Sequence, residues 1–113
     1  TLEDPIQVAL TTSSRFDLVA NPYKNVVVNP TTATSTPIGV AVAATPIGYY
    51  GWVQTKGVAA VLADGTVTVG TAVVASNATA GAVEALTGVQ APVGIAVTGT
   101  ATTEYGAINL LLD

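Results

Sequence analysis

Short runs rich in Val and Thr, each bounded by Gly, Pro, Asn or Asp, recur along the whole chain and constrain its fold more than any other feature. Val and Thr favour extended strands. The alanines follow no 3.6-residue period that would indicate an amphipathic helix. Ala, Val, Thr and Gly together make up more than half of the 113 residues. This pattern predicts an all-β protein with a single small β-barrel or sandwich domain.

The Gly, Pro, Asn and Asp residues between these runs mark the limits of the expected strands. They lie at 6–10, 15–19, 25–29, 38–43, 49–55, 58–63, 66–69, 72–74, 82–86, 93–98 and 105–112. Asp64-Gly65 separates two of them, 58–63 and 66–69. Because Asp and Gly accept the positive φ angles of a two-residue turn, this pair predicts a hairpin between those strands.

Two segments of the chain echo each other. Residues 37–42 (Pro-Ile-Gly-Val-Ala-Val) and 92–97 (Pro-Val-Gly-Ile-Ala-Val) follow one pattern at an offset of 55 residues, which also places Tyr50-Gly51 on Tyr105-Gly106. In each copy a Pro opens the strand, and a Gly two residues later permits a bulge or a close backbone approach. Two interpretations stand side by side: coincidence in a sequence of few residue types, or a domain of two related β-hairpin units packed about a pseudo-two-fold axis.

Composition excludes several classes of function. Three Lys and Arg residues stand against seven Asp and Glu, so the formal net charge is −4 and no nucleic-acid partner is expected. No apolar stretch reaches the roughly 18 residues that a membrane-spanning helix needs, and no membrane partner is expected. The absence of Cys and His removes cysteine nucleophiles and histidine acid–base chemistry. We therefore expect no enzyme, no catalytic residue, no cofactor and no metal site.

The few polar residues of a type that carries chemistry have simpler interpretations. Asp64 suits a turn, and Glu84 and Glu104 are interpreted as solvent-facing charges near strand ends. The glycosylation pattern at 77–79 arises easily by chance in a Thr-rich chain. The apolar side chains are mostly small, so the core is expected to be thin. Burial of one subunit against another would compensate, and we expect a homo-oligomer.

The run Tyr49-Tyr50-Gly51-Trp52 is the most distinctive segment. In a strand, Tyr50 and Trp52 would share one face and Tyr49 would lie on the other. Burial in the core or in a subunit interface is the favoured interpretation. An exposed platform for sugar rings is the alternative.

Residues 1–14 are assigned to an N-terminal arm or first strand, and residues 15–113 to the β-domain. Alternating apolar positions at Ile6, Val8 and Leu10 fit both assignments equally: a first strand of the domain, or an arm that adds to a neighbour's sheet edge. The candidate residues for a subunit or capsid interface are Leu2, Ile6, Val8, Leu10, Tyr23, Tyr49, Tyr50 and Trp52.

Several motifs in the last hundred residues occur together. They are Phe-Asp-Leu at 16–18, Asn-Pro-Tyr-Lys-Asn-Val-Val-Val at 21–28, Gly-Tyr-Tyr-Gly-Trp-Val-Gln-Thr-Lys-Gly at 48–57, Ala-Val-Leu-Ala-Asp-Gly-Thr at 60–66, Gly-Thr-Ala-Val-Val at 70–74, and Glu104-Tyr105 before a final apolar strand. From Arg15 onward the sequence thereby resembles small bacteriophage capsid decoration (cement) proteins, especially those of short-tailed phages.

This resemblance implies a structural virion protein on the outer capsid surface. It implies homotrimers that bind the major capsid protein and hold its subunits together, with no catalytic residues. Low charge suits such a role, because contacts with few ions are insensitive to salt. The alternative function is a carbohydrate- or receptor-binding β-module of a phage fibre or cell surface.

Overall fold

The computed structural model describes residues 9, 11–15, 17 and 19–112. These residues contain strands, turns and extended segments, and no helix. The predicted all-β class is therefore confirmed. None of the described segments is a helix that could cross a membrane. The strands are β1 (Val40–Ala41), β2 (Val53–Gln54), β3 (Lys56–Leu62), β4 (Ala72–Ala75), β5 (Val83–Ala85), β6 (Gly94–Ala96) and β7 (Tyr105–Leu111).

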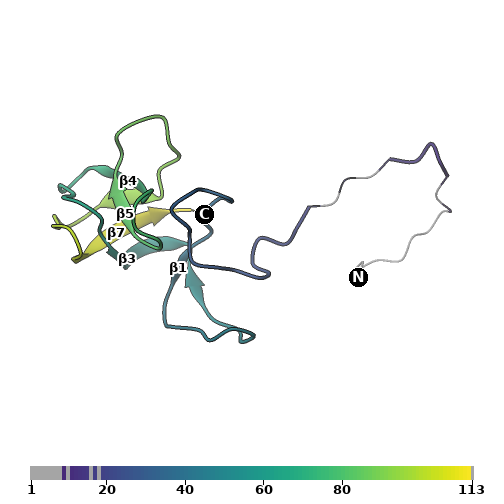
Figure 1. Cartoon of the computed structure of the whole chain (residues 1–113), viewed down its shortest axis with the longest axis horizontal. Coiled ribbons are helices and arrows are strands. Elements are labelled where there is room, and N and C mark those ends of the chain that lie inside the picture. Colours follow the sequence, from purple (N-terminus) through teal and green to yellow (C-terminus); the bar gives the residue numbers. More distant parts are fainter. Residues whose placement is uncertain (1–8, 10, 16, 18, 113) are drawn as a thin grey trace.

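Five strands form one antiparallel sheet in the order β3-β7-β6-β4-β5, and β1 and β2 form a separate two-stranded hairpin (Figure 1). The longest pairing joins β3 to β7, from Lys56 opposite Leu111 to Leu62 opposite Tyr105. Beyond β3, a single parallel bridge connects Ala63 with Val83 at the start of β5. The two edges of the sheet thus meet at one point, but the sheet does not close into a barrel.

In the two longest strands, β3 and β7, the core is built from period-2 alternation. In β3, Ala59 and Val61 are buried between exposed or half-buried neighbours, and in β7 Ile108 and Leu110 alternate with such residues in the same way. Most other core residues are Val and Ala: Ala63, Val67, Val73, Val83, Val93 and Ala96. Each small side chain buries little apolar area, which makes this core thin for the length of the chain.

The hairpin predicted at Asp64-Gly65 is wrong. Gly65 does take a positive φ of 90°. However, the Asp64 amide donates to the Val83 carbonyl oxygen at 2.8 Å, so the chain turns from β3 toward β5. The expected strand at 66–69 is reduced to one bridge between Val67 and Thr100. Pairing with β7 extends over the whole of β3, whereas residues 66–69 offer a much shorter partner.

Other expected strands are shorter than predicted or missing. The segment 38–43 contributes only β1, and 49–55 contributes only β2. The described residues of 15–19 and 25–29 form no strand. Of the strand expected at 6–10, all but one residue lies outside the described residues. Alternation alone predicts that a segment can form a strand; a strand also needs a partner edge, which these segments lack in the isolated chain.

The internal echo is a structural repeat. We call residues 37–54 the N-hairpin and residues 92–109 the C-hairpin. In the N-hairpin Val40 lies opposite Gln54 and Ala41 opposite Val53; in the C-hairpin Ile95 lies opposite Asn109 and Ala96 opposite Ile108. Every partner is displaced by the same 55 residues. The bonds that follow also match: Val42 N donates to Trp52 O at 3.1 Å, and Val97 N donates to Ala107 O at 2.8 Å.

The turns of the two hairpins match as well. Tyr49 N donates to Pro46 O, and Glu104 N donates to Ala101 O, both at 3.2 Å. Left-handed backbone occurs at equivalent positions, with φ of 84° at Gly48 and 68° at Thr103. Coincidence between similar compositions does not produce shared register and shared turns. The relation between the two hairpin units is therefore confirmed, whereas their packing about a pseudo-two-fold axis stays a prediction: β1 and β2 form a sheet of their own, apart from the one that contains the C-hairpin.

Candidate functional site

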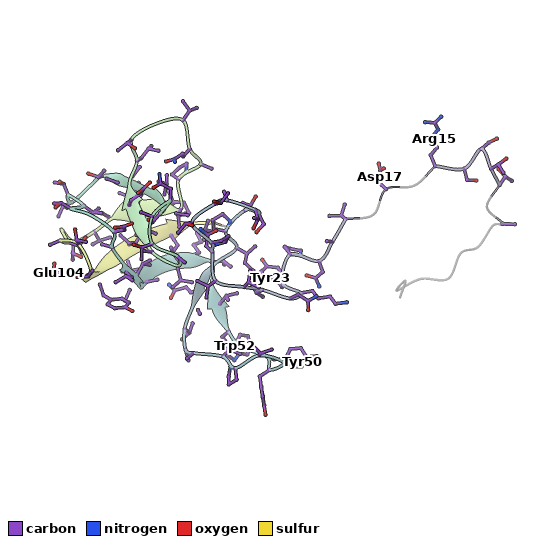
Figure 2. All side chains as sticks on the ribbon, viewed as in Figure 1. Arg15, Asp17, Tyr23, Tyr50, Trp52 and Glu104 are labelled. Atoms are coloured by element: carbon purple, nitrogen blue, oxygen red, sulfur yellow. The ribbon has the colours of Figure 1, made fainter. Side chains whose placement is uncertain are left out.

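The end of the N-hairpin carries a group of exposed apolar side chains, which we call the aromatic tip: Ile47, Tyr49, Tyr50 and Trp52. Ile47 and Tyr50 are fully exposed, Trp52 is 86% exposed, and Tyr49 is nearly as accessible. The hairpin projects away from the five-stranded sheet, with Tyr50 and Trp52 near its far end (Figure 2). These side chains are therefore available to a partner.

Local backbone geometry presents this tip. The turn closes through the bond from Tyr49 N to Pro46 O, and Gly48 takes a left-handed conformation that most side chains resist. Gly51 passes so close to the Thr45 side chain that a Cβ there would collide with the Thr45 hydroxyl. The two arms of the hairpin are consequently drawn together just below the tip, and the aromatic rings are left facing outward.

A shallow groove lies beneath the tip. It is lined by residues 42–46 and 49–52, none of which carries a charge, and its volume is about 300 Å³. A surface of this kind binds by apolar contact and stacking.

The C-hairpin provides an internal comparison for the tip. At the positions of Ile47, Tyr49 and Trp52 it carries Thr102, Glu104 and Ala107, and only the tyrosine pair Tyr50 and Tyr105 is shared. The backbone of the hairpin can therefore form without a large apolar side chain at any of those three positions. Folding of the hairpin does not account for the Ile, Tyr and Trp of the N-hairpin.

The burial of the aromatic run in a core is wrong for this chain. Tyr49, Tyr50 and Trp52 are all exposed, and none of them lies in a strand, because β2 begins only at Val53. Strand alternation could not assign their faces for that reason. Their places in a subunit or capsid interface, or in a sugar platform, stay predictions.

A second exposed apolar surface lies on the segment that precedes the N-hairpin. Tyr23 is more than half exposed, as are Val26, Val27 and Val28. The chain between residues 19 and 28 leads away from the sheet (Figure 1). It meets the sheet domain at the bond from Gly81 N to Asn29 O, at 2.9 Å. The sequence predicted a strand here and missed that its valines would be uncovered.

The remaining interface candidates, Leu2, Ile6, Val8 and Leu10, lie outside the described residues.

Polar side chains within the sheet domain serve the fold. Ser76 is almost completely buried, and its hydroxyl donates to an Asp64 carboxylate oxygen at 2.5 Å. Ser76 Oγ also accepts the amides of Ala78 and Thr79, each at 3.0 Å. With its proton donated and two bonds accepted, this hydroxyl is positioned to hold a loop. Glu104 similarly accepts the Ala101 amide at 2.8 Å across a turn.

The described acidic side chains are dispersed: no three of them come together as metal ligands would. Comparison of the chain with protein-family models, with curated proteins and with solved structures gives no match. Within the described part of the chain, the aromatic tip and the exposed valines are thus the surfaces that indicate a binding function.

Proposed function

We propose that this protein is a structural protein of a bacteriophage virion. It binds the outer surface of the capsid of a short-tailed phage as a homotrimer and stabilises contacts between major capsid protein subunits. The observation that carries the proposal is the aromatic tip, an uncovered apolar surface on a hairpin whose own fold does not require it. The sequence resemblance of residues 15–113 to capsid decoration proteins supplies the identity of the partner.

The chemistry of the tip suits permanent attachment to another protein. Tyr and Trp are the residues that most often dominate the binding energy of protein interfaces. The lining of the adjacent groove is uncharged, so a contact made there would depend little on salt.

Assembly would multiply the strength of each contact. Once one subunit of a trimer is bound, the other two bind at high effective concentration, so modest contacts become long-lived.

Binding to capsids tests the proposal. Capsids of a short-tailed phage that lack decoration protein are mixed with the full chain and sedimented, and the bound fraction is measured over a concentration series. We expect saturable binding, and a higher temperature of DNA release for the decorated particles. Absence of binding, or an unchanged release temperature, would contradict the cementing role.

The two hairpins supply a matched pair of variants. Tyr50→Ala removes a fully exposed ring from the aromatic tip, whereas Tyr105→Ala removes the equivalent ring, 72% exposed, from the C-hairpin. Loss of an interface anchor costs about 2 kcal/mol, so Tyr50→Ala should weaken capsid binding by roughly thirtyfold. Tyr105→Ala should leave binding within about twofold. Equal losses for both variants would remove the tip from the interface.

A carbohydrate- or receptor-binding module is the second candidate function. It is favoured by the combination of exposed aromatic rings and a shallow groove beside them. Because Trp52 is the only tryptophan in the chain, its fluorescence reports directly on that groove. Saturable fluorescence changes with a panel of oligosaccharides, together with no sedimentation on capsids, would replace the capsid proposal with this one.

A further inference from the structure

The hairpin repeat leaves one strand position empty beside the N-hairpin. In the sheet, β6 of the C-hairpin is paired with β7 on one side and with β4 on the other. Its equivalent in the N-hairpin, β1, is paired with β2 only, among the residues that the structure describes. Among the described residues, one edge of β1 therefore has no strand partner, and such an edge readily accepts another strand.

The same 55-residue offset identifies the segment that corresponds to β4. Residues 17–20 correspond to Ala72–Ala75, and their Val19 and Ala20 are identical to Val74 and Ala75. The turn that follows is also repeated. Tyr23 N donates to Asn21 Oδ1 at 2.9 Å, as Ala78 N donates to Ser76 Oγ at 3.0 Å.

The closing turn is therefore retained, but Asp17, Val19 and Ala20, the described residues of this counterpart, lie in no strand. Val19 is 93% exposed. Asp17 lies far from the N-hairpin of its own chain (Figure 2).

Contacts further along the chain also differ between the two repeats. Asn29 corresponds to Glu84, which lies opposite Val74 in the pairing of β4 with β5. In the structure, however, the Asn29 carbonyl accepts the Gly81 amide, and Val28 lies against Gly81. The chain thus contacts the β4–β5 loop at this point, and from there residues 28 back to 19 lead away from the sheet (Figure 1).

We propose that the segment carrying Asp17, Val19 and Ala20 pairs with the free edge of β1 in a second copy of this chain. The expected register is that of β4 against β6, in which Ala72 lies opposite Ile95. Asp17 of one copy would then lie opposite Val40 of the next. This deepens the self-association in the proposed function and does not depend on capsid binding.

Each copy has both the donor segment and the acceptor edge. The contact is therefore head-to-tail, and a closed ring of such contacts gives a cyclic oligomer. Backbone hydrogen bonds along β1 would supply the pairing, and burial of Val19 would add apolar contact. Strand exchange of this kind would also place the exposed valines of one copy close to the N-hairpin of another.

Engineered cysteines test the pairing cleanly, because the chain contains no cysteine of its own. Asp17→Cys and Val40→Cys are made in separate full-length proteins, one of which carries a tag that changes its size. The two are mixed and oxidised, and the mixed disulfide dimer is quantified on a non-reducing gel. Register partners on antiparallel strands lie within disulfide reach, so we expect the mixed dimer to be a major product.

Two control pairs fix the interpretation. Ala72→Cys mixed with Ile95→Cys should give little mixed dimer, because those residues face each other within one chain. Asp17→Cys mixed with Val42→Cys moves one cysteine two residues out of register and should give at least fivefold less mixed dimer than the pair with Val40→Cys. A double variant with both Asp17→Cys and Val40→Cys should form covalent multimers.

Three results would overturn the exchange: an internal disulfide within monomers of the double variant, equal yields from the in-register and out-of-register pairs, or no mixed dimer at all. Light scattering on the unmodified protein separates this failure from that of the proposed function. If the unmodified protein is multimeric but Asp17→Cys and Val40→Cys do not cross-link, the self-association stands and only its strand-exchange mechanism is removed. Sedimentation with capsids is scored independently.

Discussion

At the scale of single residues, the fold depends on a few buried positions at which the surrounding atoms do not tolerate another side chain. Ser76 makes three hydrogen bonds with one hydroxyl, and it connects the loop after β4 to Asp64 after β3. Substitution by Ala leaves two backbone amides and a carboxylate without this partner in a partly buried site. Such unpaired groups are more costly than the loss of a hydrogen bond in water.

Ser76→Ala should therefore lower the free energy of unfolding by about 1–3 kcal/mol. Urea denaturation, followed by far-UV circular dichroism, measures the change. Ser35→Ala, on an exposed stretch before the N-hairpin, is the matched control and should shift the midpoint very little. A Ser76→Ala protein as stable as the wild type would mean that water replaces the hydroxyl without loss.

Gly94→Ala should be more damaging, because the added Cβ would collide with the Asn109 carbonyl oxygen and lie 2.9 Å from Ile108 Cγ2. Neither the strand backbone nor a core side chain can move away freely, so we expect a loss of about 3 kcal/mol. Gly88→Ala meets nothing within 4 Å and serves as the control. Thermal unfolding of both variants compares them, and a tolerated Gly94→Ala would show that β6 can separate from β7.

At the scale of elements, the sequence predicted the repeated hairpin more accurately than the strand limits. Pro-x-Gly at 37–39 and 92–94 marks the same structure twice, because Gly39 and Gly94 both lie tightly against the opposite strand. The Asp64-Gly65 turn was misjudged, since local turn preference says nothing about which distant strand β3 will pair with. Which strand β3 pairs with depends on contacts between residues far apart in the sequence, and a local sequence pattern holds no information about them.

The candidate site was predicted only in part. The aromatic run is distinctive by composition. A short apolar segment, however, has the same sequence pattern whether it is buried or exposed. The favoured burial in the core was therefore wrong. The comparison of Ile47, Tyr49 and Trp52 with Thr102, Glu104 and Ala107 was available in the sequence once the offset was known. It is the signal that could have separated the tip from the core.

The N-hairpin makes a spectroscopic prediction. Trp52 is exposed at its tip, so the dilute protein should fluoresce at long wavelength and be quenched by acrylamide almost as strongly as the unfolded chain. Binding to capsids should shift the emission to shorter wavelength and protect the ring. A protected, blue-shifted Trp52 at high dilution would place the tip inside the fold instead, with Tyr105→Ala as a control that should leave the spectrum unchanged.

At the scale of the whole molecule, a thin core and uncovered valines together predict stability that depends on assembly. Association that buries Val19 and its neighbours favours the folded state by mass action, so the melting temperature should rise by several degrees over a hundredfold increase in protein concentration. Differential scanning calorimetry measures this rise.

A surface substitution should abolish the effect. Val19→Asp changes a residue that is exposed in the isolated chain, so the melting temperature of that variant should not vary with concentration. Val89→Asp, at a fully exposed loop position, is the matched control and should keep the dependence. A wild-type protein whose melting temperature is the same at every concentration would contradict assembly-linked stability.

The two hairpins share one backbone register but differ in how freely their side chains can be substituted. The C-hairpin is part of the five-stranded sheet, where the buried Ala96 and Ile108 leave little freedom for substitution. The N-hairpin bears exposed side chains at the corresponding turn, so these can change while the five-stranded sheet stays the same. If the surface that it touches drifts over generations, the chain can follow by altering three or four positions, and lineages should diverge fastest at 47–52 and slowest at 105–110.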